Sequence, residues 1–366
     1  MVSAEEKLRR HRAFWAGETG NKPLVIVRIG DLFLSRRFEA MLPLLERGHE
    51  ITPEQIVVED FLTDYERMFL EAEAVNQDGF FAAEPCTGLP WMEAIFGARI
   101  VGETVSVITR PVIGEPGDIK GIEDKERNQW YQKYLEFSEK LTSFAKGRFP
   151  VCQPILRGVT DTVGALMGQS EMAYALMDEP EKVKAAFFRV AEALRMLIRD
   201  QYKVTTSFLG GRSIGFYHIW APGRVIWYQE DLASLMSPAH YQEYLYQTSC
   251  RIVEDYEYSL VHLHPASFLH LDGILQVANL KAVQLNKDLT GPSVEEMLPQ
   301  CRAVLEGGKN LVLGMGPFTK GDIDAIYEEL PHERTALNIL ADSVEEANEL
   351  IEYIDSKDWE CEILHK

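Results

Sequence analysis

Two histidines placed two positions apart are the clearest candidates for a chemical function in the sequence. Residues 259–270 read SLVHLHPASFLH, so His262 and His264 follow a short apolar run. Residues i and i+2 of a β-strand project from the same face, and both imidazoles would therefore point the same way. Two imidazole nitrogens on one side are a reasonable start for a tetrahedral zinc site. The other interpretation is a pair of polar residues hydrogen-bonded to loops at the end of a strand.

Glu84 is the second residue whose surroundings suggest chemistry. It ends the run GFFAAE and precedes Pro85. A carboxyl group buried beside Phe80 and Phe81 would have a raised pKa, which suits it to proton transfer. A helix-terminal charge or an ion pair with a loop arginine is the structural alternative.

Residues 216–231, FYHIWAPGRVIWYQED, gather aromatic side chains around one histidine and one arginine. Tyr217 and Trp220 are candidates for the wall of a substrate site, and His218 is a candidate for proton handling. Arg224 could pair with a carboxylate or phosphate of a substrate. Ordinary packing of aromatic residues explains the same pattern.

The elements that would position these residues are short apolar runs separated by long helical patterns. The predicted strands are residues 24–28, 79–84, 150–156, 213–218, 259–264, 281–285, 310–315 and 336–340. Ser237 with Pro238, and Ser343 with Glu346, are typical helix starts. Strand and helix in regular alternation predict an α/β fold, a single (β/α)8 TIM barrel over residues 1–366 with an N-terminal helix within 1–22. A doubly wound sheet is the alternative, but no glycine-rich turn follows the first strand.

In such a barrel the active site lies at the carboxyl ends of the strands. The residues predicted to lie there are Arg28, Glu84, Arg157, Asp161, His218, Trp220, His262, His264, Gln284, Asn286, Asp288, Met315 and Asp342. Asp161, Asp288 and Asp342 can equally be explained as helix caps.

Composition limits the function further. The net charge of −20 argues against nucleic acid or an anionic membrane as a partner. Five scattered cysteines without a CxxC pair indicate reduced thiols. The charged N-terminus is unlike a signal peptide, and no apolar run has the length of a membrane span. We therefore expect a cytoplasmic protein, and an acidic barrel with exposed aromatic residues is compatible with a homodimer.

Three stretches resemble the uroporphyrinogen decarboxylase superfamily from about Asp78 onward. They are GFFAAEPCTGLPWMEAIFGARI at 79–100, GVTDTVGALMGQSEMAYALMDEPEKV at 158–183, and DLASLMSPAHYQEYL at 231–245. The resemblance implies a TIM barrel and one of two chemistries. These are decarboxylation of a tetrapyrrole, and zinc-dependent methyl transfer between a corrinoid and a thiol.

The decarboxylase branch of that superfamily binds substrate carboxylates through an arginine-rich N-terminal motif. The corresponding stretch here, KPLVIVRIGDLFLSRR, keeps Arg28, with Arg36 and Arg37 nearby, but lacks the family pattern. Glu84 stands where that branch carries an essential aspartate. An acidic protein without the full motif is a poor host for a highly anionic porphyrinogen.

The methyltransferase branch carries His-x-Cys after the fifth strand and a distant second cysteine. His262 falls on the histidine and His264 on the first cysteine. The second cysteine is replaced by NILADSVEEA, which leaves Asp342 or Asn338 as the nearest ligand, and Glu84 as another source of the third ligand. A His-His-carboxylate site is harder and more Lewis-acidic than a sulfur-rich one.

The resemblance therefore implies a methyltransferase acting on a small methylated or thiol substrate. His262, His264 and Asp342 would hold zinc, and the corrinoid would be carried by a separate partner protein. Glu84 and His218 would handle protons, while Arg28, Tyr217, Trp220 and Arg224 would bind substrate. The alternatives are a decarboxylase that acts on a tetrapyrrole or another carboxylated ring, and a binding protein that has lost catalysis.

Overall fold

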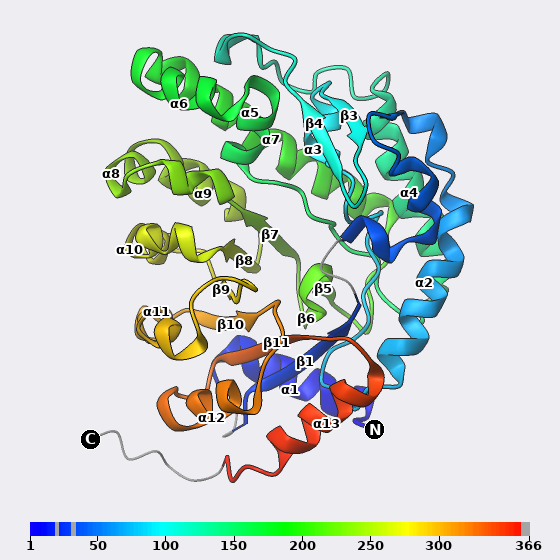
Figure 1. Cartoon of the computed structure of the whole chain (residues 1–366), viewed down its shortest axis with the longest axis vertical. Coiled ribbons are helices and arrows are strands. Elements are labelled where there is room, and N and C mark those ends of the chain that lie inside the picture. The colour runs from blue at the N-terminus through cyan, green and yellow to red at the C-terminus, as the bar shows by residue number, and fades with distance from the viewer. Residues whose placement is uncertain (19–21, 31–33, 360–366) are drawn as a thin grey trace.

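A six-stranded parallel sheet forms the centre of the computed structural model, which describes residues 1–18, 22–30 and 34–359 (Figure 1). Its strands in spatial order are β1 (Leu24–Ile29), β11 (Thr335–Ala341), β10 (Asn310–Gly314), β9 (Ala282–Asn286), β8 (Tyr258–Leu263) and β7 (Val225–Gln229). Nearly every residue of these strands is buried, as expected for a parallel sheet covered on both faces. The predicted α/β class is confirmed.

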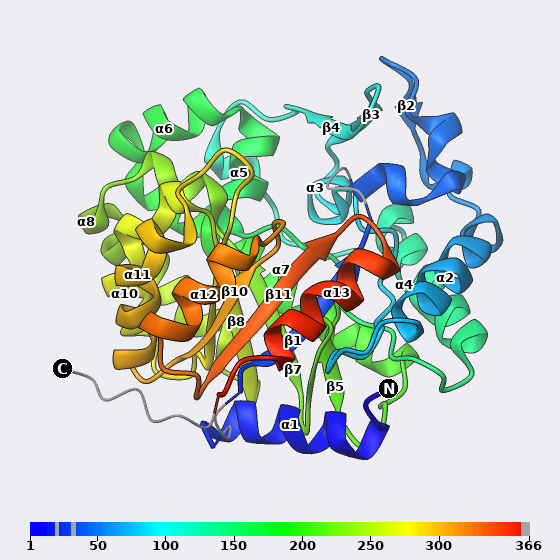
Figure 2. The same cartoon turned by 60° about the horizontal axis from the view of Figure 1, so that its bottom comes forward.

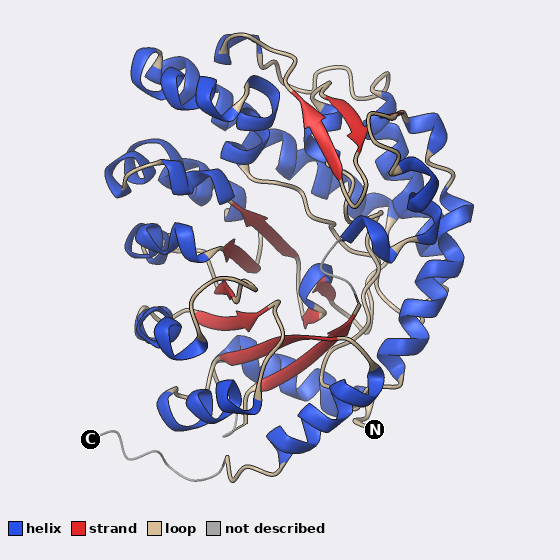
Figure 3. Ribbon diagram, viewed as in Figure 1, coloured by secondary structure: helices blue, strands red, loops and turns tan. Residues whose placement is uncertain are grey.

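Helices lie outside the curved sheet and connect its strands (Figure 3). The longer ones are α1 (Ala4–Ala16), α2 (Val58–Glu73), α4 (Gln129–Ala145), α5 (Val159–Met167), α6 (Gln169–Asp178), α7 (Pro180–Val204), α9 (Tyr246–Val253), α11 (Val294–Glu306), α12 (Lys320–Glu329) and α13 (Val344–Asp355). Short helices are α3 (Trp91–Ile95), α8 (Pro238–His240) and α10 (Leu271–Leu275). Ser237 caps α8 as predicted by accepting from the His240 N–H, but a π-helical turn, Tyr241–Leu245, separates α8 from α9.

Two of the predicted strands connect the sheet edges without forming a ladder. The Asp78 N–H donates to the Val25 carbonyl of β1, and Ala83 pairs with Val151 in an isolated parallel bridge. The Gln153 side chain then donates to the Trp227 carbonyl of β7 at 2.6 Å. Residues 79–84 and 150–156 therefore lie between β1 and β7. Side-chain amides take up part of the backbone hydrogen bonding there.

The predicted strand at 213–218 is wrong as a member of the parallel sheet. These residues belong to an antiparallel hairpin of β5 (Arg212–Ile214) and β6 (Ile219–Ala221), joined by a 3-10 turn at Gly215–Tyr217. The hairpin's apolar side chains pack in one cluster with those of β1, β7, β8 and β10. The hairpin therefore fills the space inside the sheet (Figure 1), and β7 takes the place of the predicted strand.

The two ends of the parallel strands are covered differently (Figure 2). Helix α1 lies across the side where the strands begin. A small antiparallel sheet of β2 (Glu50–Ile51), β3 (Arg99–Gly102) and β4 (Val107–Arg110) lies on the side where they end. Access to the strand ends is therefore framed by β4 and by the helices that follow it.

The cysteines remain separate thiols as far as the structure describes them. Cys86, Cys152 and Cys301 are buried, Cys250 is half-buried, and all four are free. Cys361 lies outside the described residues. Within the described ranges no helix combines the length and the apolar character needed to cross a membrane.

Candidate metal and substrate site

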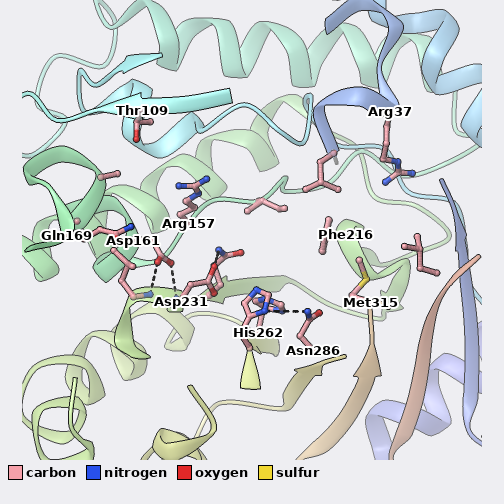
Figure 4. A pocket seen from close by; sticks show the side chains of 18 of the residues that line it. Arg37, Thr109, Arg157, Asp161, Gln169, Phe216, Asp231, His262, Asn286 and Met315 are labelled. Atoms are coloured by element: carbon pink, nitrogen blue, oxygen red, sulfur yellow. Dashed lines mark hydrogen bonds between the residues drawn. The ribbon is translucent and has the colours of Figure 1, made fainter. Parts of the chain in front are cut away.

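A cavity of about 710 Å³ opens at the carboxyl ends of the parallel strands (Figure 4). Its wall includes Arg28 of β1, Gln229 of β7, His262 of β8 and Asn286 of β9. Thr109 of β4 lines its outer part. The volume is in the usual range of small-molecule sites, and the position agrees with the predicted active-site face.

His262 and His264 both face this cavity, as their spacing predicts. Their ring centroids are 4.7 Å apart and the planes are nearly perpendicular. Asp231 completes a group whose candidate ligand atoms all lie within 4.8 Å of one another. Ligand atoms around one zinc ion at about 2.1 Å are at most about 4.2 Å apart, so the side chains need only small rotations to share an ion.

The second nitrogen of each imidazole already has an oxygen partner. His262 Nδ1 contacts Gln284 Oε1 and lies 3.0 Å from the Tyr217 hydroxyl, while His264 Nδ1 lies 2.7 Å from Asp288 Oδ1. An oxygen acceptor at Nδ1 assigns the proton to that nitrogen and leaves Nε2 with its lone pair. Burial lowers the pKa of His262, which further favours the neutral imidazole that binds metals.

Asp231 is fixed by the backbone and by one of its carboxylate oxygens. Asp161 accepts from the Asp231 and Leu232 N–H groups at 3.1 and 2.9 Å (Figure 4), and Gln229 Nε2 donates to Asp231 Oδ2 at 2.7 Å. Asp231 Oδ1 is buried and has no hydrogen-bond partner among the described residues. Burial and the neighbouring Asp231 and Glu230 raise the pKa of Asp161 well above its usual range. A cation at Asp231 would compensate this concentration of negative charge.

A reciprocal arrangement joins the end of β7 to the start of α5. Glu230 accepts from the N–H groups of Val159 and Thr160 and from the Thr160 hydroxyl, so it caps α5, just as Asp161 of α5 caps the turn that begins at Asp231. A Cβ at Gly158 would lie 1.7 Å from the Gln229 carbonyl, so only glycine permits this approach. Asp231 is thereby held in place through two interlocked elements.

A second, smaller chamber adjoins the main cavity and contains Glu84, Arg28 and Arg37. Burial outweighs the two arginines and raises the pKa of Glu84 to about 7, while the Thr87 hydroxyl donates to its carboxylate. The Arg28 guanidinium stacks over Phe216 and donates to its carbonyl at 2.7 Å. Burial lowers the pKa of Arg28 to about 9. Neither arginine forms an ion pair with a carboxylate in the described part of the chain.

His218 lines the same chamber in a conformation uncommon for its residue type. Its φ of 54° lies in the left-handed region, and the ring packs edge-on against Phe81. Nδ1 is buried without a hydrogen-bond partner among the described residues. Burial lowers the pKa of His218 well below its usual value, so the imidazole is neutral at physiological pH.

Three sequence predictions about the site need correction. Asp342 does not join the histidines; it is exposed beyond β11, and its N–H donates to Glu346. Trp220 is fully buried away from the cavity, where its indole N–H donates to the Phe208 carbonyl and Arg12 covers its ring. Arg224 precedes the first residue of β7, at the opposite end from the cavity, and pairs with Glu257.

Tyr217 lies close to the predicted site but has a different environment from the one predicted. It is fully buried behind His262, where its hydroxyl contacts Nδ1, rather than forming an open wall. Phe216, its neighbour, lines the main cavity instead.

Asp231 is absent from the predicted site because the strand before it, β7, is not among the predicted strands. The run VIWYQ, bounded by Gly223 and by two acidic residues, has the composition of a buried strand. With that strand recognised, Gln229 and Asp231 would fall at a strand end like the histidines.

Comparison with known proteins bears on the fold. No family model matches the sequence, and no curated protein matches it either. Among solved structures, a methyltransferase from Methanosarcina mazei matches with a TM-score of 0.65 and 13% identity, covering 97% of this chain and 99% of that chain. The arrangement of helices and strands described above is therefore shared with that protein over nearly the whole length of both chains.

Proposed function

We propose that the chain is a methyltransferase on a (β/α)8 barrel, with a divalent metal ion held by His262, His264 and Asp231. The observation that carries this proposal is the convergence of these three side chains in one cavity, with the Nδ1 of both histidines already occupied by oxygen acceptors. The shared fold with a methyltransferase supports the reaction class. Residues 79–84 and 150–156, between β1 and β7, are proposed to occupy the positions of the remaining two strands of the barrel.

Zinc fits this donor set. Two imidazole nitrogens and one carboxylate leave a fourth position open, which is the usual ligand count of a catalytic zinc site. When bound, the ion would supply Lewis acidity to a methyl acceptor or to the leaving atom of a methyl donor. The absence of sulfur from the set makes the centre harder than a thiolate site, and it therefore suits oxygen or nitrogen substrate atoms as well as thiols.

The chain's own residues supply binding and proton handling. Glu84, with a pKa of about 7, can hold or release a proton near neutral pH. His218 is neutral and carries an unpartnered ring nitrogen in the same chamber. Arg28 offers a buried positive charge to an anionic group of the substrate. The methyl donor is proposed to be a corrinoid carried by a separate protein, in line with the resemblance of the sequence motifs.

Decarboxylation is the second candidate, and one observation favours it. Arg28 and Arg37 are cations without a carboxylate partner among the described residues, and they adjoin a carboxyl group that is partly protonated at neutral pH. Such a chamber could bind a substrate carboxylate without a metal. A reaction that persists after complete metal removal would favour this candidate.

The decisive test is the metal content of the purified protein after parallel dialysis against zinc, cobalt and ferrous iron, measured by elemental analysis. We expect about one ion per chain in the wild type. The His262→Ala/His264→Ala variant should lose it, and Asp342→Asn should retain it as the matched carboxylate control. Folding of each variant is checked by circular dichroism. A wild-type protein that binds no zinc, cobalt or iron under these conditions would contradict the metal centre.

A further inference from the structure

A second large cavity lies on the outer face of the molecule, between α7 and α9. Its volume is about 630 Å³, and Arg224, just before β7, forms part of its wall. The candidate metal centre begins beyond Gln229, at the other end of the same strand. A strand rises about 3.3 Å per residue, so the length of β7 separates the two regions by about 17 Å. The outer cavity is therefore distinct from the site described above.

Arginines dominate the polar lining of this outer cavity in a protein whose net charge is −20. They are Arg189, Arg195, Arg199, Arg224 and Arg251. Three are held in ion pairs: Arg195 with Glu192 and Asp255, Arg224 with Glu257, and Arg251 with Glu192 and Glu254. Such pairs restrict the guanidinium positions, so that less side-chain conformational entropy is lost when a ligand binds.

Two of the five arginines have no carboxylate partner among the described residues. Arg189 donates to the Ile119 carbonyl, and Arg199 makes no described hydrogen bond or ion pair. Arg199 follows Arg195 by one helical turn on α7, so both project toward the same region. Glu123, Glu192 and Asp255 also line the cavity. Glu192 and Asp255 are engaged by Arg195 and Arg251, and Glu123 lies exposed on the loop before α4, where water screens its charge.

Tyr256 shows where the positive charges converge. Burial raises the pKa of its hydroxyl to about 12, and Arg195, Arg224 and Arg199 all oppose that rise. Asp255 acts in the other direction. All three arginines line the same cavity as Tyr256.

The rest of the wall is apolar and partly aromatic. Phe188 is 42% exposed, and Ile122, Met196 and Tyr202 also contribute. An exposed phenylalanine beside fixed cations offers a flat surface to a ring and a charged end to an anion. The volume is adequate for a ligand of metabolite size.

We propose that this outer cavity binds a small organic anion, a phosphate or carboxylate group carried on a flat apolar body, with Arg199 as the anchoring residue. A free guanidinium presents a planar fork of N–H donors that matches either anion in a bidentate manner. The anion would lie between Arg199 and the paired Arg195 and Arg224, and the apolar body would pack against Phe188 and Met196. The cavity would thus serve as a binding site separate from the reaction centre.

The test is calorimetric titration of the full chain at low salt with phenyl phosphate, benzoate and inorganic phosphate. We expect saturable binding of at least one ring-bearing anion, weakened by added salt. Tighter binding of phenyl phosphate identifies phosphate esters as the ligand class, and tighter binding of benzoate identifies carboxylates. Inorganic phosphate should bind more weakly than phenyl phosphate because it lacks the ring. The proposal would be overturned if none of the three ligands bound at a concentration of about 10 mM, which is about ten times a weak Kd of about 1 mM.

Variants test whether the anion binds in the outer cavity. Arg199→Gln should weaken binding by about tenfold or more, in keeping with the loss of hydrogen bonds to a charged group. Arg9→Gln, an exposed arginine on α1 paired with Glu6, is the matched control and should bind like the wild type. Unchanged affinity in Arg199→Gln would overturn the proposal. So would loss of binding in His262→Ala/His264→Ala, because that result would place the anion in the main cavity.

Discussion

The metal-ligand group and the Glu84 chamber share one end of the sheet but differ in how their polar groups are satisfied. Around His262 and His264, each Nδ1 has an oxygen partner, and Asp161 and Gln229 hold Asp231 in position. In the chamber, Arg28 Nε and His218 Nδ1 are buried without partners in the described residues. The metal-ligand group is organised in advance for an ion that needs fixed geometry. In the Glu84 chamber, by contrast, the protonation states of the side chains depend on the ligand that binds there.

The largest expected effect is the loss of the metal ion from the group of His262, His264 and Asp231. Asp231→Asn removes the only carboxylate of the group and introduces an amide that binds divalent cations weakly. We expect the bound ion to be lost from the purified protein, measured by elemental analysis after dialysis. Asp342→Asn is the control of equal chemistry, and retention of the ion in both variants would show that the carboxylate ligand lies elsewhere.

The pH dependence of stability tests the chamber. A carboxyl group with a folded pKa near 7 and an unfolded pKa near 4.5 binds more protons when folded between these values. Its contribution to stability is therefore present at low pH and lost as pH rises from about 4.5 to 7. We expect wild type to lose about 3 kcal/mol more unfolding free energy than Glu84→Gln across this interval.

Urea unfolding at both ends of that pH interval measures the difference, because all other titrating groups are common to the two proteins. An identical pH dependence would mean that Glu84 titrates near its ordinary value. The chamber would then be more polar than its burial indicates.

Tyr217→Phe should produce a smaller effect on the metal-ligand group. The variant keeps the ring and removes the hydroxyl that lies 3.0 Å from His262 Nδ1, while Gln284 remains as an acceptor. We expect metal affinity to fall by about tenfold, the low end of the range for partners of a metal-binding histidine. Competition with a chromogenic chelator measures it, and an unchanged affinity would assign the orientation of His262 to Gln284 alone.

The smallest effect is expected at His264. Its side chain is 38% exposed, so water can replace the Asp288 carboxylate as partner of Nδ1. Asp288→Asn should therefore weaken metal binding by less than Tyr217→Phe does, in the same chelator assay. A larger loss than in Tyr217→Phe would mean that Asp288 contributes more to holding His264 than the Tyr217 hydroxyl contributes to holding His262.

The strands that form a regular ladder could be predicted from the sequence. The runs at 24–28, 259–264, 281–285, 310–315 and 336–340 correspond to β1, β8, β9, β10 and β11, because continuous apolar stretches between turns are typical of buried parallel strands. The common orientation of His262 and His264 followed from strand periodicity, whereas their role as metal ligands also depended on the resemblance to a known family. These features depend on local sequence, which is why reading the chain in order finds them.

The errors involve residues whose place depends on distant partners. SIGFYH has the composition of a strand, but it folds back on β6 because Gly215 and the left-handed His218 permit a tight turn. Asp231 and Asp342 both follow apolar runs, but Asp231 follows β7, the neighbour of β8, whereas Asp342 follows β11, which lies three strands from β8. Trp220 and Arg224 lie away from the cavity, Trp220 against α1 and Arg224 just before β7, because the hairpin reverses the chain before β7.

The hairpin of β5 and β6 separates the residues that maintain the parallel sheet from a residue that shapes the cavity wall. Strand β8, which carries His262 and leads directly into His264, must keep its register with β7 and β9, but Phe216 and Tyr217 belong to a turn outside the parallel sheet. A change of side-chain size at Phe216 would alter the shape of the cavity wall without replacing any residue of the parallel strands. New substrate preferences could thus arise, in evolution or by engineering, from substitutions at Phe216, a position outside the paired strands of the sheet.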